Sequence, residues 1–146
     1  MMNHDALVAR YRTVGTTLRE AVARLSPRQL TLPDADGKSP LDRIIYLHRY
    51  SLALNRWIDG ITTLDRPSLP ALVADLPAGD DRPVAVLVEE FDAESQRAAA
   101  KLAALDDAAW QRQCVRTNGE VTELEGLVTR LADEYDRVLQ RLQQGT

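Results

Sequence analysis

The segment SPLDRIIYLHRYSLALNRW, residues 39–57, is the stretch of this 146-residue chain that most strongly specifies a structure. Ser39 suits a helix N-cap, Pro40 the first helical position, and Asp42 the third position of an acidic capping box. Behind them, residues separate onto two sides of a helix: apolar Leu47, Leu54 and Ile58, and charged Asp42, Arg49 and Arg56. The segment therefore predicts an amphipathic helix with one side against a core.

Three further segments carry the same apolar periodicity. One runs from Asp5 to about position 25, one from about 83 to 105, and one from a predicted capping box of Thr122 and Glu125 to about 142. No segment alternates convincingly with period two, so strands are not expected. The inward positions are Leu7, Tyr11, Val14, Leu18, Val22 and Leu25; Val84, Leu87, Val88, Phe91, Ala98, Leu102 and Leu105; and Leu124, Val128, Leu131, Tyr135, Val138 and Leu142.

The two halves of the chain echo each other. RLSPRQL…GKSPLDRII and ALDDAAW…GEVTELEGLV each read as a helix end, a turn with one apolar anchor (Leu30 or Trp110), a glycine and a new helix. The connection DGITTLDRPSLPALVADLPAGDDRP joins them and predicts a crossover with a short helical turn near LPALVADL. We expect one domain, 1–146, with an all-α fold: a four-helix bundle of two αα-hairpin halves joined by a long connection. Trp57 and Trp110 are expected to be packing anchors.

Composition narrows the classes of function. A net charge of −4 supplies no basic footprint for nucleic acid. The single cysteine, Cys114, excludes an internal disulfide and fits a reducing cytoplasm. No apolar run approaches the ~20 residues of a membrane span, and MMNHDALVARYR lacks the apolar core of a signal peptide. We expect a cytoplasmic domain that interacts with neither nucleic acid nor membrane.

The order and spacing of these segments resemble the DinB/YfiT-like superfamily of small helical bundles. LSPRQL after the first helix, the segment 39–57, LDDAAW after the third helix and TELEGLVTRLADEYDRVLQRL in the fourth carry the resemblance. It implies a bundle in which three histidines, one on the second helix and two on the fourth, bind a divalent metal. For some members it implies a transferase or isomerase that uses a low-molecular-weight thiol.

The implied ligand positions hold other residues here. They are Tyr46 on the second helix and, depending on register, Asp133 with Arg137 or Arg130 with Glu134 on the fourth. His48 lies two residues after Tyr46, and no histidine follows it. The resemblance therefore supports the fold and not the metal site, and we expect no metal cofactor.

Tyr46, His48 and Glu134 are the candidate site residues. His48 is either a structural residue hydrogen-bonded across the bundle, which we favour, or a metal ligand. Tyr46 either packs on Tyr50 one turn away, which we favour, or donates a hydrogen bond in a pocket. Glu134 flanks the apolar side of the fourth helix. Near His48 it would form an ion pair, act as a general base or complete a weak metal site.

Two other polar groups favour a structural interpretation. Asp133 projects away from the apolar side and is expected to pair with Arg137 on the surface. Cys114, with Arg112 and Arg116 nearby, is expected to be a structural or incidental thiol, because no histidine lies close in sequence to act as its base.

Three functions remain open. We favour a DinB-like domain that has lost its catalytic metal and binds a small molecule or a protein partner. The second is a transferase-like or hydrolase-like enzyme in which Tyr46, His48 and Glu134 converge on one pocket. The third is a homodimer whose role is interaction, since the helix at 39–57 has a wide apolar side.

Overall fold

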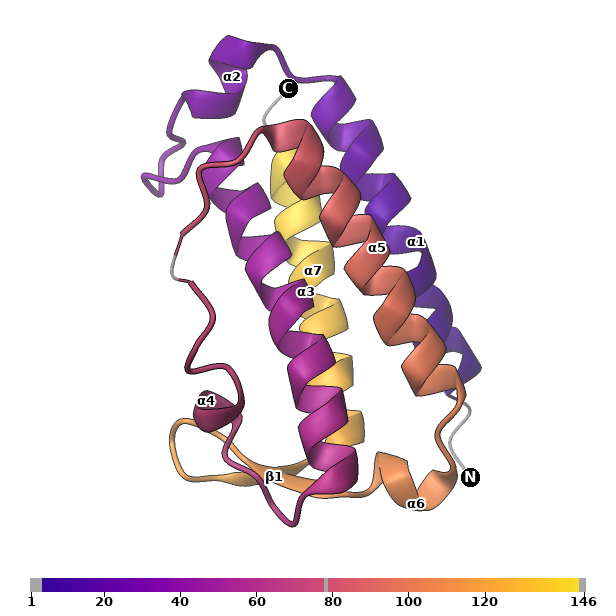
Figure 1. The fold of residues 1–146 in the computed structure, drawn as a ribbon. Helices are drawn as coiled ribbons and strands as arrows, with labels where there is room; N and C mark the ends of the chain where they lie inside the picture. Colours follow the sequence, from indigo (N-terminus) through magenta and orange to yellow (C-terminus); the bar gives the residue numbers. More distant parts are fainter. Residues whose placement is uncertain (1–3, 78, 145–146) are drawn as a thin grey trace.

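The structure, a computed structural model, describes residues 4–77 and 79–144. Four long helices form the bundle (Figure 1): α1 (Asp5–Ala23), α3 (Pro40–Thr63), α5 (Val84–Ala103) and α7 (Leu124–Gln144). The other elements are short: α2 (Pro27–Thr31), α4 (Leu69–Leu72), α6 (Asp107–Trp110), β1 (Gln113–Val115) and β2 (Val121–Glu123). The predicted all-α four-helix bundle is confirmed.

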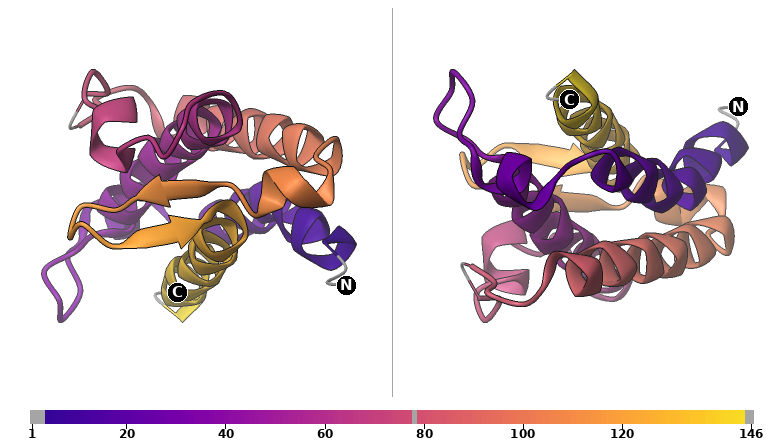
Figure 2. Two further views of the ribbon diagram at one scale, coloured as in Figure 1. Left: turned by 90° about the horizontal axis from the view of Figure 1, so that it is seen from below. Right: turned by 90° about the horizontal axis from the view of Figure 1, so that it is seen from above.

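The two halves of the chain interlock. α1 and α7 run in one direction, and α3 and α5 run in the other (Figure 1). After α3 the chain returns along the outside of the bundle, with α4 as the predicted helical turn. Seen end-on, α1 and α3 each pack between α5 and α7 (Figure 2). Each helix therefore buries its apolar side mainly against the helices of the other half, so neither half has a complete core alone.

The core follows the predicted inward positions, all of which are buried or half-buried. Tyr11, Leu47 and Phe91 are fully buried, and each comes from a different helix. α1 and α5 approach closely at Gly15, where a Cβ atom would lie 2.2 Å from Oδ1 of Asp92. A residue without a side chain therefore lets these two helices meet.

The predicted start of α3 is confirmed in detail. The Ser39 hydroxyl accepts a hydrogen bond from the Asp42 amide at 3.1 Å, and the Asp42 carboxylate accepts one from the Ser39 amide at 3.0 Å. Pro40 occupies the first helical position. These contacts satisfy two donors that a helix N-terminus leaves unpaired, so the local sequence alone fixes where α3 begins.

The expectation of no strands is wrong for one segment between α6 and α7. β1 and β2 pair antiparallel, with Cys114 opposite Thr122. Gly119 turns the chain at a φ of +84°, in the region that favours glycine. Each strand has three residues, too few to display a period-two pattern. The signal that finds this hairpin is the Asn118–Gly119 pair between two valines.

The predicted capping box at the start of α7 is also wrong. Thr122 belongs to β2, and α7 begins at Leu124. Glu125 instead faces the start of the chain, where its Oε2 lies 2.8 Å from Nε2 of His4. Thr122 is paired with Cys114 in the hairpin, so its backbone is not available to cap α7.

Both tryptophans are packing anchors, as expected. Trp110 is 2% exposed, and the ring of His4 stacks on it with centroids 4.0 Å apart. Trp57 is 9% exposed and donates from Nε1 to the Leu69 carbonyl at 3.2 Å, which fixes α4 against α3. Trp57 therefore joins α4 to α3, and Trp110 anchors α6 in the core.

The large apolar side chains that stay exposed among the described residues lie on different segments: Leu32, Tyr46, Leu64, Val86 and Val121. Within the described part of the chain, no helix combines the length and the apolar character that crossing a membrane requires.

Candidate functional site

A groove of about 1080 Å³ lies between α3 and α7. The segment 69–76 and the hairpin loop line it together with the two helices, so its walls come from four parts of the chain that are far apart in sequence. Its apolar lining includes Tyr50, Trp57, Leu69, Val73 and Leu131. A groove of this size is large enough for a small organic molecule.

Every position at which the family resemblance implies a metal ligand lines this groove: Tyr46, Arg130, Asp133, Glu134 and Arg137. The polar groups of three of them satisfy one another. The Tyr46 hydroxyl donates to Oε1 of Glu134 at 3.1 Å, and the Arg137 guanidinium donates to Oε2 of the same carboxylate. The Tyr46 ring also packs on Tyr50, as expected, with centroids 4.7 Å apart.

The predicted surface pair of Asp133 and Arg137 is wrong, although both side chains are exposed as expected. Asp133 accepts a hydrogen bond from Arg10 of α1 at 2.9 Å, and Arg10 also donates to Asp136 at 2.6 Å. Arg137 pairs with Glu134, three residues before it. Arg10 comes from the neighbouring helix α1, so the spacing of residues within α7 does not reveal it as a partner of Asp133.

These side chains do not fit a divalent cation. Transition metals in proteins prefer imidazole, thiolate and carboxylate ligands, and the described residues contain no group of three or more His, Cys, Asp and Glu that could hold a metal ion. Partial desolvation of the hydroxyl, together with the nearby Tyr50 and Glu134, raises the pKa of the Tyr46 phenol above its usual value, so it stays protonated. The Glu134 carboxylate is already paired with a guanidinium.

No protein-family model and no curated protein significantly matches the sequence. Among solved structures, the chain is similar to YfiT from Bacillus subtilis, described as a probable metal-dependent hydrolase with an unusual four-helix bundle topology. The TM-score is 0.80 over 97% of this chain and 84% of the YfiT chain, at 16% identity. The chain has the DinB/YfiT-like fold. The resemblance seen in the sequence is thus confirmed at the level of the fold.

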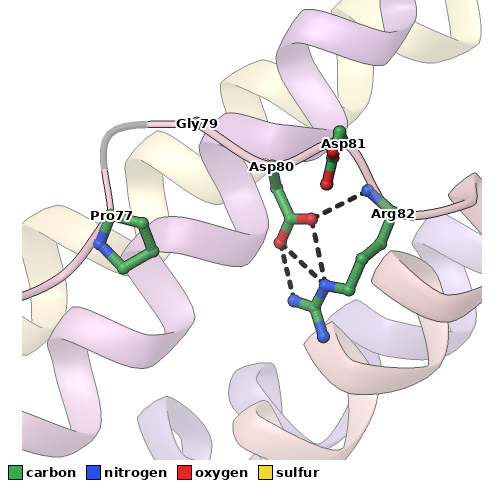
Figure 3. Close-up of a pocket in the computed structure, with 5 residues that line it drawn as sticks. All are labelled: Pro77, Gly79, Asp80, Asp81 and Arg82. Atoms are coloured by element: carbon green, nitrogen blue, oxygen red, sulfur yellow. Dashed lines mark hydrogen bonds and ion pairs between the residues drawn. The ribbon is translucent and has the colours of Figure 1, made fainter.

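Within this YfiT-like bundle, His48 lies away from the groove. It faces α5, is 2% exposed, and its Nε2 lies 2.8 Å from Oε2 of Glu90. Its Nδ1 lies 3.7 Å from Oδ2 of Asp80, and Arg82 donates to Asp80 and to Glu90, at 2.6 Å in each case. We call these four residues the His48 cluster. Figure 3 shows the Asp80 carboxylate directed at the Arg82 guanidinium.

The structure therefore brings Tyr46 and Glu134 together and places His48 elsewhere. Tyr46 faces α7 across the groove, whereas His48 faces α5 and the segment before it. The single pocket that the enzyme hypothesis requires of these three side chains is not assembled. His48 is buried and hydrogen-bonded across the bundle, which is the interpretation that the sequence favours.

The His48 cluster makes the stability of the fold sensitive to acid. Hydrogen bonds from Arg82 lower the pKa of Asp80 to about 2, against an ordinary value of about 3.9. A carboxylate with a lowered pKa stabilises the fold above its ordinary pKa and loses that contribution as the pH falls through its folded pKa. We expect the difference in thermal midpoint between the wild type and Asp80→Asn to be constant above pH 5 and to shrink between about pH 4 and pH 2.

Asp81→Asn is the matched control, because Asp81 is exposed in the same short segment. Its difference from the wild type is expected to be small at every pH. An equal acid dependence for the two variants would contradict the assignment of this effect to the ion pair of Asp80 and Arg82.

A buried phenol lies in the core of the bundle. Tyr135 is fully buried, and its hydroxyl has no hydrogen-bond partner among the described residues. Its ring meets Tyr11 and Phe91 edge-on, with centroids 5.9 Å and 5.3 Å away. Burial raises the pKa of Tyr135 well above the ordinary value, so the group is a neutral donor at physiological pH. An unsatisfied buried hydroxyl opposes folding.

Tyr135→Phe is therefore expected to leave the free energy of unfolding unchanged or to raise it by up to about 1 kcal/mol. Tyr11→Phe is the matched variant, because the Tyr11 hydroxyl donates to the Val128 carbonyl; it is expected to lose about 1 kcal/mol. Urea unfolding of the two variants measures this contrast. Equal losses would show that the Tyr135 hydroxyl is satisfied in solution.

Cys114 lies on β1, fully buried, with its Sγ directed at the Thr122 carbonyl at 3.6 Å. Burial raises the pKa of its thiol above the usual value, so little thiolate forms near neutral pH. This environment is that of a structural thiol, as the sequence led us to expect.

Sequence reasoning missed the role of the arginines in the groove. The sequence predicts that Arg49 lies on the charged, solvent-facing side of its helix, and Arg49 is indeed exposed. It also borders the groove, one helical turn from Tyr46. Arg116 reaches the groove from the hairpin loop. The spacing of Tyr46 and Arg49 was a usable signal for α3. Nothing local in the sequence brings Arg116 to the same place.

Proposed function

We propose that this chain is a binding domain on a DinB/YfiT-like bundle, which takes a small molecule in the groove between α3 and α7 and carries no catalytic metal. The observation that supports the proposal most directly is the chain of contacts from Tyr46 to Glu134 to Arg137 at the implied ligand positions. The Tyr46 phenol is neutral and the Arg137 guanidinium is positive. These positions therefore lack the net negative charge that would stabilise a bound cation.

The apolar lining supports the binding part of the proposal. Tyr50, Trp57 and Val73 present carbon surface to a groove that also contains charged groups, which is the usual composition of a small-molecule site. YfiT is described as a probable metal-dependent hydrolase. We do not extend that activity to this chain, because the hydrolase-like alternative needs His48 beside Tyr46 and Glu134, and His48 faces α5.

Metal analysis tests the proposal. We expect protein purified without a metal-affinity tag to contain far less than one equivalent of nickel, zinc or manganese by mass spectrometry. Its thermal midpoint is expected to be the same with and without EDTA, because no folding free energy comes from a bound cation. Stoichiometric metal that EDTA removes, with a fall in the midpoint, would rule the proposal out.

A further inference from the structure

The charge in the groove has the opposite sign to the charge of the chain. Arg49, Arg116, Arg130 and Arg137 border it, with Asp133 and Glu134 as the opposing carboxylates, whereas the whole chain carries −4. Asp133 is paired with Arg10 of α1, Glu134 with Arg137, and Arg116 lies 3.7 Å from Glu120. Within the described residues the positive charge of Arg130 is left uncompensated. The groove is therefore a local positive site on an acidic protein, and such a site attracts anions.

Arg130 is the cation of this set that is best placed to bind a ligand. It lies on α7, is exposed, and has no hydrogen-bond or ion-pair partner among the described residues. The neighbouring carboxylates one turn further along α7, Asp133 and Glu134, are held by other arginines. A guanidinium presents a planar pair of donors that matches a carboxylate.

The wall of the groove formed by α3 and the segment after α4 has a different character. Tyr50 meets Trp57 edge-on, with ring centroids 6.1 Å apart, and both line the groove beside Val73. The indole N–H of Trp57 is already satisfied by the Leu69 carbonyl. This wall therefore offers carbon surface, which gains free energy by burying a hydrocarbon or an aromatic ring.

We propose that the ligand of the groove is an amphipathic anion, a carboxylate with an apolar body, whose carboxylate binds Arg130 and whose body lies on Tyr50 and Trp57. This inference rests on the proposed function and adds to it the chemical class of the ligand. The positive groups set the sign of the head group, and the tyrosine and tryptophan rings set the nature of the tail.

The test compares two probes that differ only in charge: 11-(dansylamino)undecanoate and its methyl ester. Binding is followed by dansyl emission excited through tryptophan, since Trp57 lines the groove. We expect the carboxylate to bind with a Kd at least about tenfold below that of the ester, the size of effect that a charge-assisted contact supplies. Arg130→Gln should raise the Kd of the carboxylate about tenfold and leave that of the ester unchanged.

Arg28→Gln is the matched control, because it removes the same charge from an exposed position on α2, outside the groove. It is expected to change neither Kd. Equal Kd values for the two probes, absence of binding by both, or the same loss in Arg28→Gln and Arg130→Gln would each overturn the anion proposal. Stoichiometric metal would instead contradict the proposed function, so the two failures are distinguishable.

Discussion

Trp110→Ala is expected to lower the free energy of unfolding by about 3–5 kcal/mol, the range seen when a large buried aromatic side chain is removed. The indole is 2% exposed and belongs to the core although it lies on the short helix α6. Its removal leaves a cavity and also removes the surface on which the ring of His4 stacks. Urea unfolding followed by far-ultraviolet circular dichroism measures the loss.

The similarity between the two halves of the sequence supplies the control. Ser26 and Asp106 cap the two equivalent short helices, accepting hydrogen bonds from the amides of Gln29 at 3.1 Å and Ala109 at 2.8 Å. Leu30 occupies the place of Trp110 in the first half but is only half-buried. Leu30→Ala is therefore expected to lose about 1–2 kcal/mol. If the losses at Leu30 and Trp110 are equal, the second half does not carry the larger anchor. Should Trp110→Ala fail to fold, Trp110→Phe replaces it, with a loss between the two.

The four long helices are predictable from the sequence because each satisfies a local rule. The start of α3 needs only Ser39, Pro40 and Asp42, which are adjacent in the chain. The hairpin was missed because strands of three residues form through pairing with each other, and a residue such as Thr122 does not reveal its cross-strand partner Cys114. The capping box is a local rule, and it predicts that Thr122 begins a helix, whereas Thr122 belongs to β2.

The candidate site was predicted less well, because it depends on contacts between distant segments. The sequence favours a His48 that is hydrogen-bonded across the bundle, but it does not reveal the partner, because Glu90 lies 42 residues later, on α5. Tyr46 and Glu134 are 88 positions apart and meet only because α3 and α7 are neighbours in the bundle. The sequence thus identified residues with suitable chemistry and could not determine which of them share a pocket.

The His48 cluster leads to the second large effect, a loss of about 2–3 kcal/mol in His48→Ala. The imidazole joins α3 to Glu90 of α5 and approaches Asp80 in the segment before that helix. Its removal breaks a partly buried hydrogen bond to a charged group and leaves a cavity in place of the buried imidazole. The loss stays below that of an orphaned buried charge, because Arg82 continues to neutralise both Asp80 and Glu90.

His4→Ala makes the same chemical change at the other histidine of the chain. The His4 side chain is 15% exposed and pairs with Glu125 at the end of the bundle, so its loss is expected to be about 1 kcal/mol. Urea unfolding compares the two variants, and hydrogen exchange of the peptide spanning residues 79–90 locates the effect. Exchange there should accelerate in His48→Ala and not in His4→Ala, since His48, unlike His4, contacts Asp80 and Glu90 of that segment. Equal losses with unchanged exchange in both variants would show that His48 fills space without joining the segment before α5 to the bundle.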